Sequence, residues 1–599
     1  MQVIAKHLYP AVAAFLAAYA AHIYLRRSDV PAPAGGRCHD ARPSDRDAAG
    51  GPYRHGAVAS DSAQCSRIGR DTLMNGSAVD AAIATILCLG VVHPQSLGLG
   101  GGFVMTVYTK DTGTSQVINA LETAPLASSE DMFAENPDLA TMGGISVAVP
   151  GQVRGLWEAH QRYGKLPWRD LFLPAIQLAE EGTCIGKHLA IAMRVKEADI
   201  LDRKYGLCDV FCDEHGTMLR ENTTVRRPQL AKTLLAVANG GADAFYTGEI
   251  AKNLVKDIHN HGGIITEQDL LDYRAEVTTP LNTSLPDGRV LLTSPPPSGG
   301  AVLSLILNIL AGYGLNSSAR EGVQNQVLTY HRMLEAYKFG FAHWMELGDP
   351  NFVNVEKLTK RMVSKDFADE LRRKIDDTRT FDSSYYGLDV PSQDISGTSH
   401  VSVLGPNGDA VAVTSSIGRY FGARFRSLST GIILNNHMEL YTLRGENGST
   451  RISSKSPGYA VQPGKRGKTL MSPTVVLNSS GDVRLVIGGS GGYKLMTGLT
   501  DALFHHLLLG MNISSAIEKP RLHLAVTQDV GELNYERRNP FKPEEVLHEL
   551  EKMYGKAVPE WHQAMVQAVA REDLAISGSA REDSAISGSA REDSAVEKN

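Results

Sequence analysis

Apolar residues recur with helical spacing through most of the first two thirds of the chain. The stretch 78–92, AVDAAIATILCLGVV, is apolar almost all round and predicts a buried helix. Further helices are predicted within 151–280, over the apolar stretch 301–314 and, with an amphipathic pattern, within 325–375. This part of the chain is therefore predicted to be mainly helical.

Alternating strand patterns dominate the last third. Residues 398–404 and 410–416 flank Pro406-Asn407-Gly408-Asp409, which is a strong hairpin turn. Pairing across this turn brings Ser416 alongside Thr398. A second strand pair is predicted within 472–489, followed by a helix over 497–510. Helices that cover two layers of sheet make an α+β fold.

The first thirty residues differ from the rest. Residues 8–25 form an alanine-rich apolar run of 18 between Lys6 and Arg26-Arg27. A membrane helix needs about 20 such residues. A cleaved signal peptide is the alternative, although the run is long for its apolar part. We expect a single membrane anchor over 1–27, followed by a Pro/Gly-rich linker or stalk over 28–56.

The C-terminal end is a repeat. From Ala570 a ten-residue unit of the form AREDxAISGS recurs almost three times. Its polar, low-complexity composition predicts a disordered or weakly ordered tail over 570–599.

Composition adds little beyond a globular class. The chain has 599 residues, of which 42% are hydrophobic and 21% charged, and its net charge is -6. A nucleic-acid-binding surface is not expected at this charge. No bulk-charge argument favours a membrane surface either.

Two features disagree about the side of the membrane on which the body lies. Two arginines follow the apolar run and one lysine precedes it, so the positive-inside rule places the body in the cytosol. Glycosylation sequons favour the opposite side, where we expect the body to lie. The sequons begin at Asn75, Asn222, Asn282, Asn316, Asn447, Asn478 and Asn512.

The cysteines leave two interpretations open. Cys208 and Cys212 form either a small disulfide loop or two unrelated thiols. No His or Cys pair elsewhere completes a zinc site, so no metal is expected. The full set is Cys38, Cys65, Cys88, Cys184, Cys208 and Cys212.

Thr398 follows Gly397 directly at the start of a predicted strand, which raises the hypothesis that the chain is cut there. A freed α-amino group has a pKa near 8 and can take the proton of its own threonine hydroxyl. Ser416 can hydrogen-bond that hydroxyl, and the glycines of 488–492 can expose backbone N–H groups as an oxyanion hole. The alternative is structural: Thr398 is a β-former in a hairpin and the glycines are a turn. The pattern alone favours this alternative.

The stretch 398–422, TSHVSVLGPNGDAVAVTSSIGRYFG, resembles the signature of the γ-glutamyltransferase (glutathione hydrolase) family. That signature opens with Thr-Ser/Ala-His-x-Ser and closes on an aromatic-Gly pair, here Phe421-Gly422. The resemblance covers about residues 57–570. It includes the segments 65–88, 93–108, 166–182, 245–258, 430–439 and 518–523.

The resemblance implies a four-layer αββα N-terminal-nucleophile hydrolase fold, preceded by one transmembrane helix. It implies self-cleavage into a large subunit ending at 397, with its folded part over 57–397, and a small subunit whose folded part is 398–569. Thr398 would be the nucleophile, Ser416 its hydroxyl partner, and Gly491 and Gly492 the oxyanion-hole glycines. The family's disulfide positions match Cys65 with Cys88 and Cys208 with Cys212.

The family's substrate and location are also implied. Substrates would be γ-glutamyl amides such as glutathione, with water, an amino acid or a peptide as acceptor. The body would be extracellular on a single-pass type II plasma-membrane protein. No cofactor is indicated, because the amine–hydroxyl pair needs none.

The positions that recognise the γ-glutamyl zwitterion depart from the family pattern. Leu121 stands where the family has the arginine that binds the α-carboxylate. The acidic pair that contacts the ammonium falls at His437 and Leu440. The other substituted positions are Gly418, Thr469 and Leu470.

These substitutions are predicted to weaken binding. Each charge-assisted hydrogen bond is worth about 1.5–3 kcal/mol, so losing three or more costs several orders of magnitude in affinity. Glu122 and Glu439 neighbour lost positions, but strand neighbours are expected to point elsewhere.

Three hypotheses follow. The first is an active γ-glutamyl hydrolase or transferase. The second is a self-processing amidase with a less charged acyl donor, whose pocket Leu121 and Leu440 would line. The third is a family member without catalytic activity that acts by binding.

Overall fold

The computed structural model describes residues 56–388, 397–444, 450–451, 456–525, 532–536, 541–560, 564–572, 575–580 and 586–588. They belong to one compact unit, Asp40–Asn599. The predicted anchor over 1–27 and the linker up to residue 55 lie outside the described residues. Within the described ranges, no helix has both the length and the apolar character needed to cross a bilayer.

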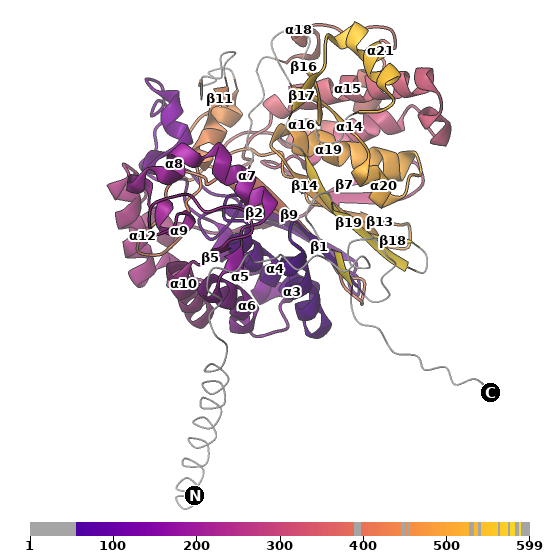
Figure 1. Cartoon of the computed structure of the whole chain (residues 1–599). Helices are drawn as coiled ribbons and strands as arrows, with labels where there is room; N and C mark the ends of the chain where they lie inside the picture. The colour runs from indigo at the N-terminus through magenta and orange to yellow at the C-terminus, as the bar shows by residue number, and fades with distance from the viewer. Residues whose placement is uncertain are drawn as a thin grey trace, which may run out of the picture. The chain divides into compact units, whose positions relative to one another are not determined.

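Two antiparallel sheets lie at the centre of this unit (Figure 1). The strand order of the first, among described residues, is β20 (Ile586–Gly588), β1 (Ala57–Ser60), β9 (Gly397–Leu404), β10 (Ala410–Gly418), β2 (Gly102–Thr109), β3 (Thr114–Ala120) and β6 (Glu276–Thr278). The order of the second is β19 (Ala575–Ala580), β18 (Met565–Glu572), β14 (Val483–Ser490), β13 (Thr474–Leu477), β8 (Val290–Thr293) and β7 (Leu281–Ser284).

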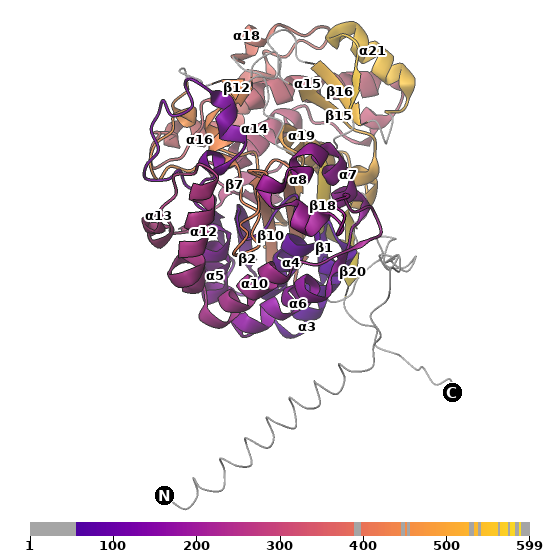
Figure 2. The same cartoon turned by 60° about the vertical axis from the view of Figure 1, so that its left-hand side comes forward.

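Helices cover the outer face of each sheet, as Figure 2 shows with β2, β10 and β1 between the two groups. The first group is α3 (Ala63–Asn75), α4 (Ala78–Val92), α5 (Gln152–Tyr163), α6 (Trp168–Glu181), α7 (Lys187–Val195), α8 (Glu197–Leu201), α9 (Cys208–Phe211), α10 (Pro228–Gly240), α11 (Asp243–Tyr246), α12 (Gly248–Asn260) and α13 (Glu267–Asp272). The second is α14 (Gly300–Ala311), α15 (Val323–Met345), α16 (Glu356–Met362), α17 (Lys365–Arg372), α18 (Ser383–Tyr386), α19 (Tyr493–Leu503), α20 (Ile513–Glu518) and α21 (Glu544–Tyr554). Smaller pairings join β4 (Thr183–Cys184) with β5 (Thr224–Val225), β11 (Leu443–Arg444) with β12 (Thr450–Arg451), and β15 (Leu522–Ala525), β16 (Glu532–Glu536) and β17 (Val558–Glu560).

Three apolar clusters hold these layers together, so the expected αββα layering is present. One lies between the first sheet and its helices and another between the second sheet and its helices. The third lies between the two sheets and includes many small residues, which let the sheets approach closely. Its members are Ala57, Ala59, Tyr108, Leu292, Leu404, Ala410, Ala412, Val475, Leu477, Val483, Val486 and Val569.

Several predicted elements are confirmed. The helix predicted over 78–92 is α4, and Ser77 and Asp80 form a capping box at its N-terminus. The hairpin predicted around 406–409 is the β9–β10 pair. The helix predicted over 497–510 begins earlier, as α19 at Tyr493, and continues as a π-helical turn through Leu508.

The C-terminal repeat contributes two short strands, which its composition did not predict. Residues 575–580 of the tail pair with β18 as β19, and 586–588 pair with β1 as β20. Both strands add to sheet edges, where unpaired backbone groups accept a new strand with little demand on its side chains. Composition alone does not reveal such pairing. The expected boundary at residue 569 falls within β18, which ends at Glu572.

A buried carboxylate links the two sheets next to the start of β9. Asp61 follows β1 and accepts hydrogen bonds from the hydroxyl of Ser399 and the amide of Gln567, which lie on β9 and β18. Among the described residues, no cation contributes to the shift in the pKa of Asp61. Burial therefore raises the pKa of Asp61 to about 7, although the hydrogen bonds from Ser399, His400 and Gln567 oppose the shift.

Asp61 should make the protein less stable as the pH rises from about 4 to about 7. The folded state holds the proton of this carboxyl more tightly than the unfolded state, so its contribution is complete below pH 3.8 and is lost as the pH passes about 7. Asp61→Asn removes this titration and should flatten the fall in melting temperature between pH 4 and 7. Asp111→Asn, at an exposed turn, is the control. A variant at 61 with the wild-type slope would contradict the assignment.

Candidate active site around Thr398

The β9–β10 hairpin fixes the position of Thr398. In the antiparallel register Ser416 lies opposite Thr398, as the sequence predicts, and Gly418 lies opposite Gly397. A register shift between Ser416 and Gly418 marks a bulge at the end of β10. At Gly418 the backbone has a φ of +95°, a conformation that favours glycine.

The hydroxyl of Ser416 contacts both sides of the Gly397–Thr398 peptide bond. Its Oγ accepts a hydrogen bond from Thr398 Oγ1 at 3.2 Å and from the Gly418 amide at 2.8 Å. It donates its own hydrogen to the carbonyl oxygen of Gly397 at 2.5 Å. Thr398 is 5% exposed and Ser416 1% exposed. Through Ser416, the arrangement links the Thr398 hydroxyl to the carbonyl directly before it, out of bulk water.

Gly491 and Gly492 lie at the junction between β14 and α19. Their φ values are +117° and +62°, and α19 begins at the next residue. The carbonyl oxygens of Gly491 and Gly492 accept hydrogen bonds from the backbone amides of Lys494 and Leu495 at 3.1 and 3.2 Å, so the two glycines form the turn that starts the helix. β14 packs on β9, since a Cβ built at Gly488 would lie 2.2 Å from the ring of His400. The oxyanion-hole role of the two glycines stays a prediction.

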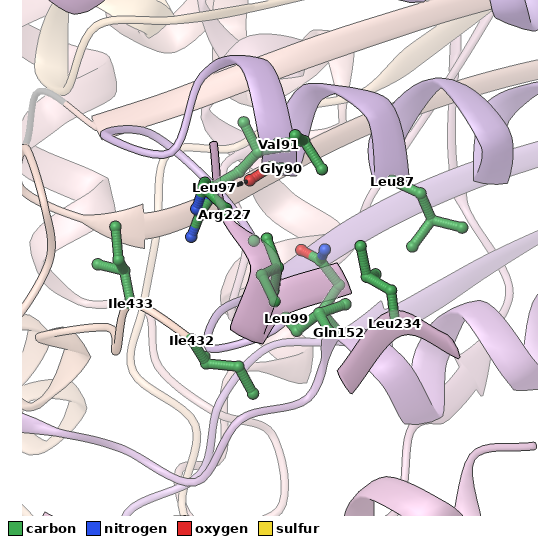
Figure 3. Close-up of a pocket in the computed structure, with 12 residues that line it drawn as sticks. Leu87, Gly90, Val91, Leu97, Leu99, Gln152, Arg227, Leu234, Ile432 and Ile433 are labelled. Atoms are coloured by element: carbon green, nitrogen blue, oxygen red, sulfur yellow. Dashed lines mark hydrogen bonds between the residues drawn. The ribbon is translucent and has the colours of Figure 1, made fainter. Parts of the chain in front are cut away.

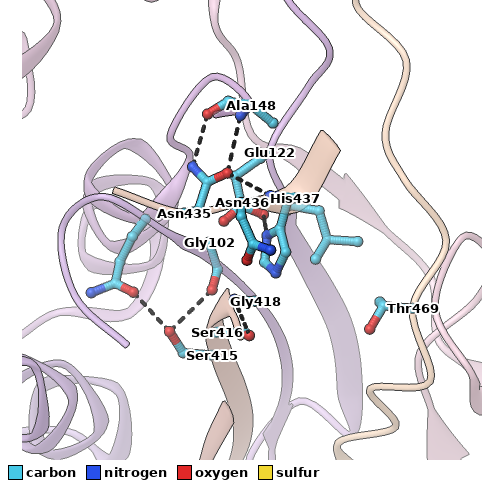
Figure 4. Close-up of polar contacts among 12 residues, drawn as sticks. Gly102, Glu122, Ala148, Ser415, Ser416, Gly418, Asn435, Asn436, His437 and Thr469 are labelled. Atoms are coloured by element: carbon cyan, nitrogen blue, oxygen red, sulfur yellow. Dashed lines mark hydrogen bonds and ion pairs between the residues drawn. The ribbon is translucent and has the colours of Figure 1, made fainter. Parts of the chain in front are cut away.

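The structure brings several of the substituted positions together next to Ser416 (Figure 4). A Cβ at Gly418 would lie 2.0 Å from Asn436 Oδ1 and 3.2 Å from the ring of His437. Asn435 holds the segment before His437 by hydrogen bonds to Gly100 and Ala148. His437 and Leu440 belong to a short 3-10 helix, His437–Tyr441.

The remaining substituted positions are apolar or lie farther away. Leu121 is buried just after β3, in a small cluster with Val104, Val117 and Met471. Leu440 packs against Gly467. Leu470 is buried, and Thr469 lies apart from the group around His437 in Figure 4.

Two buried titratable side chains in this region lie in contact with each other. His437 Nδ1 lies 2.7 Å from Glu122 Oε2, and both side chains are almost fully buried. The prediction that Glu122 points away from the lost positions is wrong. Strand alternation does not apply to it, because β3 ends at Ala120.

A second internal pair involves a residue that the sequence analysis did not single out. Arg419 donates to both carboxylate oxygens of Glu439, and the Asn436 amide donates to the same carboxylate at 2.8 Å. Asn436 also accepts a hydrogen bond from the Arg419 backbone. Its place in the sequence, directly after the substituted position Gly418, could have indicated that Arg419 lies in this region. The two carboxylates nearest the lost acidic positions therefore have partners within the chain.

The structure contains both predicted disulfides, Cys65–Cys88 between α3 and α4 and Cys208–Cys212 around α9. Cys184 is disulfide-bonded as well. In the described part of the chain, no three or more His, Cys, Asp or Glu side chains are grouped to hold a metal ion.

Comparisons with known proteins agree with this geometry. The family model for gamma-glutamyltranspeptidase matches residues 65–590. Scoloptoxin SSD14 of Scolopendra dehaani is 40% identical over 511 residues, which are 85% of this chain and 87% of the relative. Glutathione hydrolase 2 of Arabidopsis thaliana is 43% identical over 472 residues, 78% of this chain and 80% of the relative.

A solved structure shares the fold. The cephalosporin acylase from Bacillus halodurans superposes with a TM-score of 0.78 at 25% identity, covering 94% of this chain and all of the acylase chain. The layers, the hairpin at Thr398 and these matches lead to one conclusion: the chain belongs to the γ-glutamyltranspeptidase family of N-terminal-nucleophile hydrolases.

Proposed function

We propose that this protein is a self-processing hydrolase that cuts its own chain between Gly397 and Thr398 and then uses Thr398 as the nucleophile. The observation that supports this most strongly is the Ser416 hydroxyl, which is hydrogen-bonded to both the Thr398 hydroxyl and the Gly397 carbonyl. A threonine in an ordinary hairpin would not need that arrangement.

The cleavage follows from these hydrogen bonds. Thr398 Oγ1 attacks the carbonyl carbon of Gly397 and passes its proton to Ser416, which passes its own proton to the carbonyl oxygen. The C–N bond then breaks with a proton moving to nitrogen, which leaves an ester between Gly397 and Thr398 Oγ1. Water hydrolyses the ester and leaves a Gly397 carboxylate and a free Thr398 amine.

The freed amine makes the mature site. With a pKa near 8, it accepts the hydroxyl proton as Thr398 attacks a substrate amide. The acyl group passes to Thr398 Oγ1, the leaving amine takes the proton, and water or an amine acceptor releases the acyl group. Backbone N–H groups at Gly491 and Gly492 stabilise the oxyanion.

The acyl donor is a γ-glutamyl amide, as family membership indicates, but we propose that this chain binds it weakly. A zwitterion needs an arginine for its carboxylate and acidic groups for its ammonium. Leu121 offers no charge, and Glu122 and Glu439 are already paired with His437 and Arg419. Two alternatives remain: an amidase with a less charged acyl donor, or a family member without catalytic activity.

We also propose that residues 1–27 anchor the protein in the plasma membrane with its body outside the cell. Disulfides form in oxidising compartments, which supports an extracellular body. Exposed sequon asparagines are available for glycosylation at Asn75, Asn282, Asn316 and Asn512; Asn222 and Asn478 are half-buried, and Asn447 lies outside the described residues.

Thr398→Ala should abolish cleavage. The wild-type ectodomain should run on a denaturing gel as two chains and the variant as one, because no hydroxyl remains to attack Gly397. Ser416→Ala should slow cleavage by about 100-fold or more if the proton relay operates, and Ser416→Thr, which keeps the hydroxyl, should restore it. A Thr398→Ala sample that is cut at the same bond would contradict self-processing.

Restoring the lost charges should restore γ-glutamyl turnover. The triple variant Leu121→Arg, His437→Glu and Leu440→Asp should raise kcat/KM on a γ-glutamyl anilide by about 100-fold or more, since each charged contact is worth about 1.5–3 kcal/mol. The effect should lie mainly in KM.

The matched control is the neutral triple Leu121→Gln, His437→Gln and Leu440→Asn, which adds polarity without charge. Both triples should be checked for cleavage at Thr398, so that a folding defect is recognised. Equal activity in the two triples would contradict the pocket argument.

A further inference from the structure

A small cavity lies between α4, the start of α10 and the segment 432–433, on the helix-covered side of the first sheet (Figure 3). Its volume is about 10 Å³, enough for one water-sized occupant. The lining is apolar apart from Arg227 and Gln152. Leucine, isoleucine and valine side chains from α4, α10 and the segments 97–99 and 432–433 form the apolar lining.

Arg227 is a buried cation without a counter-charge. It is 5% exposed and donates only to two backbone carbonyls, Gly90 at 2.8 Å and Gly431 at 3.3 Å. Its Nε has no hydrogen-bond partner among the described residues. No described carboxylate forms an ion pair with it, and the charge that acts on it is another cation, Arg426.

This isolation has an energetic consequence. Burial and Arg426 lower the pKa of Arg227 to about 9, so the guanidinium still carries its charge at neutral pH. A buried charge without a counter-charge destabilises the folded state even when some of its donors are hydrogen-bonded. Carbonyl oxygens satisfy donors but supply no negative charge. Buried arginines usually pair with a carboxylate, as Arg426 does: its guanidinium lies 2.9 Å from the Asp209 carboxylate.

Gln152 adds a second polar group to the cavity. It is fully buried and its Nε2 has no partner in the described part of the chain. Its Oε1 lies 2.7 Å from the hydroxyl of Ser415, the residue before Ser416. The cavity therefore connects, through one side chain, to the strand that carries the Ser416 hydroxyl.

We infer that this cavity binds a single monovalent halide, chloride under physiological conditions, as the counter-ion of Arg227. Carboxylates, phosphate and sulfate carry several oxygens that each need donors, whereas the unpartnered side-chain donors that line the cavity in the described part of the chain are Arg227 Nε and Gln152 Nε2. The apolar lining favours an anion that loses its hydration shell readily, and guanidinium is itself weakly hydrated. A water molecule would satisfy the Nε–H but would leave the charge unpaired.

Halide binding to the folded state should raise its melting temperature. At equal ionic strength, 0.5 M sodium chloride or bromide should raise the melting temperature of the full chain by about 2 °C relative to sodium gluconate. Sulfate stabilises proteins generally, so gluconate, which is too large to enter, is the reference. Crystals grown in bromide should show an anomalous-scattering peak in the cavity beside Arg227.

Two variants separate this site from a general salt effect. Arg227→Met removes the charge and should abolish the halide-specific rise. Arg426→Met removes a buried arginine that already has a carboxylate partner and should keep the rise. Should Arg227→Met fail to fold, the anomalous map of the wild-type protein decides.

Three results would overturn the inference. One is a wild-type melting temperature that is equal in chloride and gluconate, even with a bromide peak, because binding would then occur at crystal concentration only. Another is a halide-specific rise that persists in Arg227→Met. The third is a bromide crystal without anomalous density in the cavity, which would indicate water.

Discussion

The pairing of β9 with β10 is the constraint on which the site depends. It places the Ser416 hydroxyl opposite Thr398 and against the carbonyl of Gly397. A register slip of one residue would turn Ser416 to the other face of the sheet. Burial of both strands between two layers makes such a slip costly, because every core side chain of the hairpin would also be displaced. Asp61, which binds Ser399 and Gln567, holds the start of β9 against the second sheet.

Around Thr398, the carboxylates nearest the substituted positions lie against other side chains of the chain. In a pocket for a zwitterion, carboxylates and an arginine must stay available to the ligand. Here Glu122 lies against His437, and Glu439 is held by Arg419 and Asn436. Thr398 and Ser416 thus follow the family pattern, whereas the positions proposed to bind the γ-glutamyl group do not. This difference is the physical basis for proposing weak γ-glutamyl binding with self-cleavage retained.

Local sequence patterns were sufficient to predict much of the fold. The helix 78–92 and the 398–416 hairpin are set by short-range periodicity and turn chemistry, so the sequence alone predicts both. Resemblance to a family supplied the disulfide pairs, and it favoured the catalytic hypothesis for Thr398 and Ser416 over the structural one. Pairing between distant segments was not predictable: Glu122 meets His437 across more than 300 residues, and β20 joins β1 from opposite ends of the chain. The sequence also did not indicate that Arg227 is buried without a carboxylate partner, because this depends on how distant segments pack in the core.

The central claim is that the bond between Gly397 and Thr398 is broken by the chain itself, and the free amine it creates is directly measurable. N-terminal labelling of the purified, folded protein, followed by mass spectrometry of its tryptic peptides, would report every α-amine present. The account predicts a labelled peptide that begins at Thr398, together with a peptide that ends at Gly397. Recovery of an unlabelled peptide that runs through both residues as the main species would contradict it.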